Sequence, residues 1–141
     1  INRVLNSEKK LNLSKEKTFK NFFKIINKSK IRLNKFLKNA NKLGKKVHGY
    51  GASTKGNVLL QYYKINNTIV DFIAERNENK YNLFTPGTKI KIISEYLSRA
   101  YNPDYYLVLP WHFKKEILLG EKKIRRKGTK FIFPLPILKV I

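Results

Sequence analysis

The sequence contains no cysteine and no methionine, and only 9 of its 141 residues are acidic. Without cysteine, the chain can form neither disulfide bonds nor thiolate-bound metal sites. Two histidines are too few for a zinc site unless carboxylates complete it. We therefore expect that any metal this protein needs is held outside these residues.

Long apolar runs are also missing, so no segment is expected to span a bilayer. The N-terminus has neither the apolar core nor the small-residue cleavage site of a signal peptide. These absences predict a cytoplasmic location and no membrane partner. Because the chain opens with Ile1 and contains no methionine, we expect a processed or shortened piece of a longer polypeptide.

The charge is strongly one-sided, at +22. Such an excess is typical of proteins that bind nucleic acid or anionic surfaces. It is not concentrated, however: residues 1–45 hold 14 Lys and Arg against 2 acids, and residues 46–141 hold 17 against 7. A bias towards lysine, asparagine and isoleucine is also what an AT-rich coding sequence produces. We favour this drift in composition over a polyanion-binding surface, which makes nucleic acid an unlikely partner.

Residues 14–44 carry apolar side chains at helical spacing. The positions are Phe19, Phe22, Phe23, Ile26, Leu33, Phe36, Leu37 and Ala40. Ser14 is the expected N-cap, and Gly44 ends the run. The pattern predicts one or two amphipathic helices that pack on the following sheet or on a neighbouring domain, with residues 1–13 as a linker. We divide the chain into this segment, 1–45, and a domain, 46–141.

From residue 46 onward, short apolar runs alternate with helical segments, which predicts an α/β fold with a parallel sheet. The expected architecture is a Rossmann-like, doubly wound sheet of about five strands. In the usual ordering the first strand is central, the second and third lie on one side, and the fourth and fifth on the other. The strands are expected at 46–50, 68–74, 89–93, 105–109 and 130–133, and the helices at 55–64, 94–100 and 111–119.

A glycine-bearing turn between the first strand and its helix is the first candidate site. Its spacing fits neither the dinucleotide fingerprint nor the P-loop, so no motif supports NAD binding or NTP hydrolysis. Helix amides, a cation and hydroxyls nevertheless coincide here, which favours anion binding over an ordinary turn. The candidate binding residues are Tyr50, Gly51, Ser53, Thr54, Lys55, Gly56 and Asn57.

Two further loops should meet this turn at the carboxyl end of the sheet. Trp111, His112 and Phe113 follow the fourth strand and would line a crevice there, unless they only begin the next helix. Glu75, Arg76 and Asn77 follow the second strand, where dinucleotide folds hold a ribose, although a solvated turn is an equal alternative. Residues 85–88, Thr-Pro-Gly-Thr, predict a type II turn.

Five collinear blocks resemble the C-terminal domain of S-adenosylmethionine-dependent sugar C-methyltransferases. They are the turn at 49–57; Ala-Glu-Arg-Asn at 74–77 with Lys80-Tyr81; Thr-Pro-Gly-Thr at 85–88; Pro-Asp-Tyr-Tyr-Leu-Val-Leu-Pro-Trp-His-Phe at 103–113; and Phe-Ile-Phe-Pro-Leu-Pro at 131–136. Residues before 46 resemble the family only loosely.

The resemblance implies a polypeptide in which a cysteine-rich zinc domain and a domain that binds S-adenosyl-L-methionine precede this one. The whole enzyme would methylate a carbon of a keto-deoxysugar carried on a nucleoside diphosphate. Neither the zinc ligands nor a donor-binding loop occurs here, so we expect this chain to bind the nucleoside-diphosphate sugar, to contact the upstream methyltransferase domain, and to be inactive alone. No residue of the chain is assigned to catalysis. A basic nucleic-acid-binding module and a stand-alone nucleotide-binding Rossmann module are the alternatives.

Overall fold

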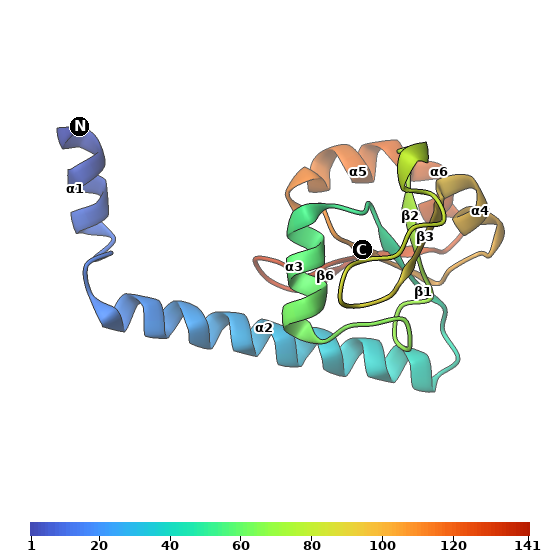
Figure 1. Ribbon diagram of the computed structural model, residues 1–141, viewed down its shortest axis with the longest axis horizontal. Coiled ribbons are helices and arrows are strands. Elements are labelled where there is room, and N and C mark those ends of the chain that lie inside the picture. The colour runs from blue at the N-terminus through green and yellow to red at the C-terminus, as the bar shows by residue number, and fades with distance from the viewer.

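The computed structural model describes residues 1–141 as three layers, with a central sheet between two layers of helices (Figure 1). The strands are β1 (Val47–Tyr50), β2 (Phe72–Glu75), β3 (Lys91–Ser94), β4 (Tyr105–Val108), β5 (Lys130–Phe133) and β6 (Lys139–Val140). The α-helices are α1 (Asn2–Lys10), α2 (Glu16–Lys42), α3 (Thr54–Tyr63), α4 (Glu95–Ala100), α5 (Lys114–Gly120) and α6 (Lys122–Arg126). Single turns of 3₁₀ helix, η1 (Glu78–Lys80) and η2 (Trp111–Phe113), follow β2 and β4.

The strand order is β3-β2-β1-β4-β5-β6, and the first five strands are parallel. The predicted doubly wound order is confirmed. From β1, the strands β2 and β3 follow on one side, and β4 and β5 lie on the other. The topological switch point therefore lies between β1 and β4, where the last residues of the two strands, Tyr50 and Val108, are paired. The antiparallel strand β6 was not predicted, nor was the separate helix α6.

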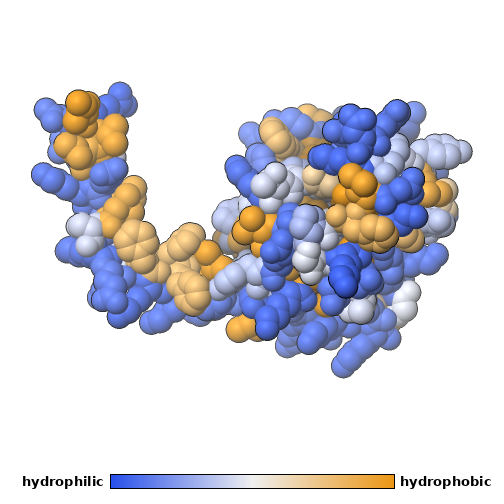
Figure 2. Space-filling view, viewed as in Figure 1, coloured by the Kyte–Doolittle hydropathy of each residue, from blue (hydrophilic) through white to orange (hydrophobic).

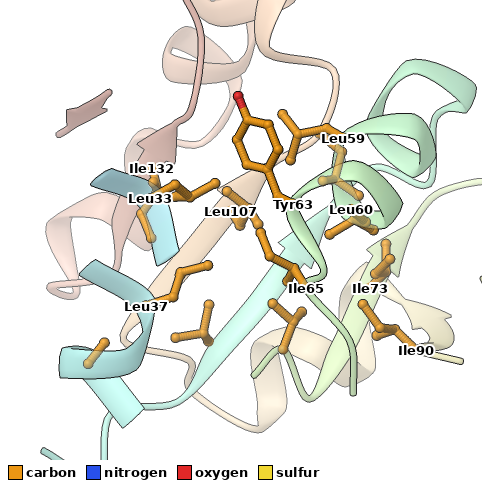
Figure 3. Close-up of a cluster of buried hydrophobic side chains, with 14 of the residues drawn as sticks. Leu33, Leu37, Leu59, Leu60, Tyr63, Ile65, Ile73, Ile90, Leu107 and Ile132 are labelled. Atoms are coloured by element: carbon orange, nitrogen blue, oxygen red, sulfur yellow. The ribbon is translucent and has the colours of Figure 1, made fainter. Parts of the chain in front are cut away.

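Two apolar clusters fill the spaces on either side of the sheet. Strand residues alternate between the faces, so Gly49 and Leu107 face α2 and α3, whereas Tyr50 and Tyr106 face α4, α5 and α6. In the larger cluster, leucines from α2 and α3 pack together on one face of the sheet. Figure 3 shows seven of its residues: Leu33, Leu37, Leu59, Leu60, Ile73, Leu107 and Ile132.

The segment before the sheet differs in part from expectation. A single helix of 27 residues, α2, forms where one or two were predicted. It begins at Glu16 with Lys15 as its N-cap, so the predicted cap at Ser14 is wrong. Gly44, at φ 69°, ends it as predicted. Residues 1–13, predicted to be a linker, contain the helix α1, of which no residue is buried. None of the helices has the length and apolar character that a membrane span requires.

Candidate functional site

The turn after β1 is clamped by two charged side chains from the β2 end of the sheet. Gly51 takes a positive φ of 78°, which glycine adopts without strain. At the next residue, Glu75 Oε2 accepts a hydrogen bond from the Ala52 amide at 2.8 Å, and Lys80 Nζ donates to the Ala52 carbonyl at 2.9 Å. Both backbone groups of Ala52 are therefore held, which fixes the path of the turn.

The second carboxylate oxygen of Glu75 is also engaged. It accepts from the amides of Arg76 at 2.8 Å and Asn77 at 3.1 Å. Partial burial by itself raises the pKa of this carboxyl, but the three backbone hydrogen bonds outweigh it, and the pKa lies below its ordinary value. A ribose at this position would have to share oxygens that already hold backbone, so the structure gives Glu75 a positioning role.

Replacing Glu75 with glutamine is expected to lower the free energy of unfolding by about 1 kcal/mol at neutral pH, because an amide is a weaker acceptor than a carboxylate. The sign follows from the lowered pKa: the contribution is present above the ordinary pKa of 4.5 and is lost as pH falls through the lower folded value. Urea unfolding at pH 7 and pH 3 should show the gap between the two proteins closing in acid. A gap independent of pH would contradict the charged clamp.

The first turn of α3 presents unused hydrogen-bond donors. Ser53 caps the helix by accepting from the Gly56 amide at 3.1 Å, whereas the amides of Thr54 and Lys55 have no acceptor in the chain. The side chains of Thr54 and Lys55 are exposed beside them. Two free amides at a positive helix end, a hydroxyl and an ammonium group together suit an anion such as phosphate.

The glycines of the turn serve internal packing. A methyl group on Gly56 would lie 2.4 Å from Cβ of Leu109, and one on Gly49 would lie 2.8 Å from the Ile73 side chain. The space beside the backbone at these two glycines is filled by Leu109 and Ile73, so neither position is open to a cofactor such as S-adenosylmethionine.

Two hollows flank the clamped turn. One, of about 300 Å³, is lined by Ser53, Thr54, Asn57 and Lys80 among others, and the buried Asn57 Oδ1 has no hydrogen-bond partner. The other, of about 320 Å³, lies where β1 and β4 end, and its walls include Tyr50, Gly51, Arg76 and Phe113. The predicted candidates lie at the same edge of the sheet, but only some of them line these hollows: Ser53, Thr54 and Asn57 line the first, and Tyr50, Gly51, Arg76 and Phe113 line the second. The others, Lys55, Gly56, Glu75, Asn77, Trp111 and His112, line neither.

A network of hydrogen bonds and ion pairs joins three residues that line the second hollow, Tyr50, Arg76 and Glu95, to Arg99 and Glu121 behind them. Tyr50 donates to Glu121 Oε1 at 2.8 Å, and Arg99 reaches the same oxygen at 2.8 Å. Arg76 bridges Glu121 at 3.4 Å and Glu95 at 2.8 Å. Burial and the bond to Glu121 raise the pKa of Tyr50 far above its ordinary value, so the phenol stays protonated.

The sequence did not single out Glu95, Arg99 or Glu121. Glu121 carries the strongest available signal, since it is one of only two acids in the basic stretch 114–130. Lys80 appeared only within a block of the family resemblance.

The Trp-His-Phe loop spreads its side chains in different directions. Trp111 is partly buried against both core clusters and lines a third, apolar groove together with Lys55. His112 is exposed, with its ring centroid 4.3 Å from that of Phe113, which lines the second hollow. The loop leads directly into α5, and of its three residues Phe113 alone lines the second hollow.

His48 lies away from these hollows, inside β1. It is buried, and its Nδ1 lies 2.8 Å from Ser98 Oγ, which in turn contacts the Tyr106 hydroxyl at 2.8 Å. Burial lowers the pKa of His48 to about 4, so its imidazole is neutral at physiological pH. A core role explains this histidine.

Comparison with known proteins decides the family. The sequence model described as the C-methyltransferase C-terminal domain matches residues 1–136. The chain belongs to this family. The match includes the residues of α1 and α2, which precede residue 46.

The chain is also 38% identical over 98 residues to the C-methyltransferase NovU of Streptomyces niveus. The alignment covers 70% of this chain and 23% of NovU, so the chain spans about a quarter of the length of that curated relative. No group of three or more His, Cys, Asp or Glu side chains that could hold a metal ion occurs in the structure of this C-methyltransferase domain.

Proposed function

We propose that this C-methyltransferase C-terminal domain binds the nucleoside-diphosphate portion of a keto-deoxysugar and orients the sugar for methylation by an S-adenosylmethionine-dependent domain. The observation that carries the proposal is the pair of free amides at the start of α3, with Lys55 exposed beside them. They lie at the carboxyl edge of the sheet, next to the switch point, where open α/β sheets bind ligands.

The diphosphate is assigned to the α3 amides, the hydroxyls of Ser53 and Thr54, and Lys55. The first hollow, lined by Asn57 and Lys80 among others, would take an adjoining part of the sugar nucleotide. The second hollow carries Glu95 and Glu116 in its wall against Arg76 alone, so it suits a neutral sugar or base better than a phosphate.

Binding of the nucleoside diphosphate would assist methylation although it lies away from the reacting carbon. Carbon methylation requires removal of a proton beside the ketone and in-line placement of the methyl group. Binding energy from a remote nucleotide can hold the reacting carbon in place. S-adenosylmethionine, when bound elsewhere in the polypeptide, supplies the methyl group; the residues of this chain bind and orient.

The proposal predicts saturable binding of a thymidine-diphosphate sugar and of thymidine diphosphate by the 141-residue chain. Lys55→Ala should weaken binding about tenfold, because it removes a charge-assisted hydrogen bond. Isothermal titration calorimetry at low and moderate salt measures the effect. Lys38→Ala is the matched control, since Lys38 is an exposed lysine of α2 and lies outside the candidate site.

A short duplex DNA belongs in the same experiment, because the charge of +22 supports the alternative of nucleic-acid binding. Binding of DNA alone, with an affinity that falls steeply as salt rises, would refute the sugar-nucleotide proposal. Equal losses in the Lys55 and Lys38 variants would show that only net charge matters.

A further inference from the structure

Helix α2 carries one apolar stripe, and this domain covers only its C-terminal half. At 100° per residue, Leu33, Leu37 and Ala40 lie on the same side of the helix as Phe19, Phe22, Phe23 and Ile26. The first three are buried on the sheet, whereas the three phenylalanines are between 55% and 60% exposed. We call Phe19, Phe22, Phe23 and Ile26 the α2 ridge.

The α2 ridge projects away from the sheet. In Figure 1 the N-terminal half of α2 extends beyond the globular part and turns into α1, and Figure 2 shows orange side chains along the inner side of this bent arm. Three neighbouring aromatic rings, each more than half exposed, form an apolar patch larger than scattered surface residues produce. Patches of this kind mark interaction surfaces.

An apolar groove joins the α2 ridge to the candidate site. Phe23 and Ile26 line it from α2, Val58 and Tyr62 line it from α3, and Lys55 and Trp111 complete its site end; its volume is about 330 Å³. The junction is held by an edge contact between Phe23 and Tyr62 and by a hydrogen bond from the Tyr62 hydroxyl to Asn27 Oδ1 at 3.2 Å. A partner protein bound to the α2 ridge and this groove would therefore also lie next to Lys55.

The opposite side of the same helix is solvated. Lysines 17, 20, 24 and 28 lie there, and Lys20 pairs only with the exposed Glu16 at 2.8 Å. The division between an aromatic side and a lysine side means that one face of the projecting helix is built to be covered and the other to stay in water.

We propose that the α2 ridge and the adjoining groove are the docking surface for the methyl-donor-binding domain of the C-methyltransferase. The stripe continues an interface already formed within this domain, since its second half packs on the sheet. The helix belongs to the family's C-terminal domain, and NovU has about three quarters of its length outside the matched part. Docking there places the donor domain beside Lys55, so this inference rests on the proposed function.

The test joins the part of NovU that precedes its matched segment to residue 1 of this chain. Hydrogen–deuterium exchange of residues 16–26 is then compared between this fusion and the isolated chain, after both are shown to unfold cooperatively. Exchange in the fusion should be at least about tenfold slower, because a docked helix frays less. The double variant Phe19→Ser, Phe22→Ser should remove this protection. Ile31→Ser is the control, since Ile31 is 66% exposed and lies among the lysines on the opposite side of α2.

Equal exchange in the fusion and the isolated chain would overturn the proposal. Protection in the isolated chain that grows with its concentration, and that the double variant abolishes, would overturn it in favour of a second copy as the occupant. The double variant should still bind the thymidine-diphosphate sugar as a separate chain. If the unaltered chain binds the nucleotide but the unaltered fusion shows no protection of residues 16–26, this inference alone is refuted, whereas loss of nucleotide binding by the unaltered chain refutes the proposed function.

Discussion

Replacing Gly56 with alanine is expected to lower the free energy of unfolding by about 3 kcal/mol. The new methyl group would lie 2.4 Å from Cβ of Leu109 and 2.9 Å from Ser53 Oγ. Leu109 Cβ is attached directly to the backbone at the end of β4, so the contact cannot be relieved by rotation of a side chain. Helix α3 must shift away from the sheet instead. Thermal or urea unfolding measures the loss.

Gly120→Ala is the matched control for this change. Gly120 also lies in a helix, but nothing lies within 4 Å of the position of its methyl group. Alanine there should be neutral or stabilising by up to about 1 kcal/mol, because glycine is the poorer helix former. Because the shift of α3 moves the free amides of Thr54 and Lys55, Gly56→Ala should also weaken nucleotide binding. A Gly56→Ala protein as stable as Gly120→Ala would refute the tight contact between α3 and β4.

The second large effect is expected at Glu121. Glu121→Leu should lower the free energy of unfolding by about 3 kcal/mol, because it removes the acceptor of the buried Tyr50 hydroxyl and the partner of Arg99 while roughly keeping the volume. Glu121→Gln keeps an oxygen for Tyr50 and should cost less. The difference between the two variants separates the hydrogen bond from the ion pair.

Glu116→Leu provides the control for Glu121, since Glu116 lies on the neighbouring helix but is exposed. Its effect on stability should stay within about 0.5 kcal/mol. Urea unfolding of the three variants at pH 7 makes the comparison. If Glu121→Leu proved as mild as Glu116→Leu, the network beneath Tyr50 would not contribute to the stability of this edge of the sheet.

The order of the five parallel strands could be predicted because each buried strand appears in the sequence as a short apolar run between turn signals. The run at 130–133 coincides with β5, and the Thr-Pro-Gly-Thr turn was recognisable from composition, with Gly87 at φ 73°. Strand β6 was not predicted because its two residues, Lys139 and Val140, are both exposed and show no alternation of buried and exposed positions.

The contacts that shape the candidate site were not predictable, because they join residues far apart in the chain. Tyr50 and Glu121 are separated by 71 positions, and no local pattern pairs them. The position of Glu75 at the end of β2 was predictable from the apolar run before it, whereas the backbone amides that its two oxygens accept from were not. Composition cannot distinguish a carboxylate that faces a ligand from one that holds a loop.

The length of α2 also has a mechanical consequence. A helix of 27 residues spans about 40 Å, and its C-terminal part is held on the sheet by Leu33 and Leu37. It therefore acts as a rigid lever with its pivot under the sheet. A tilt of about 5° at this pivot would move the far end by roughly 3 Å, which is enough to misalign two reactants. The packing of Leu33 and Leu37 on the sheet therefore determines how precisely the projecting end of α2, and any partner docked on it, is positioned relative to the candidate site.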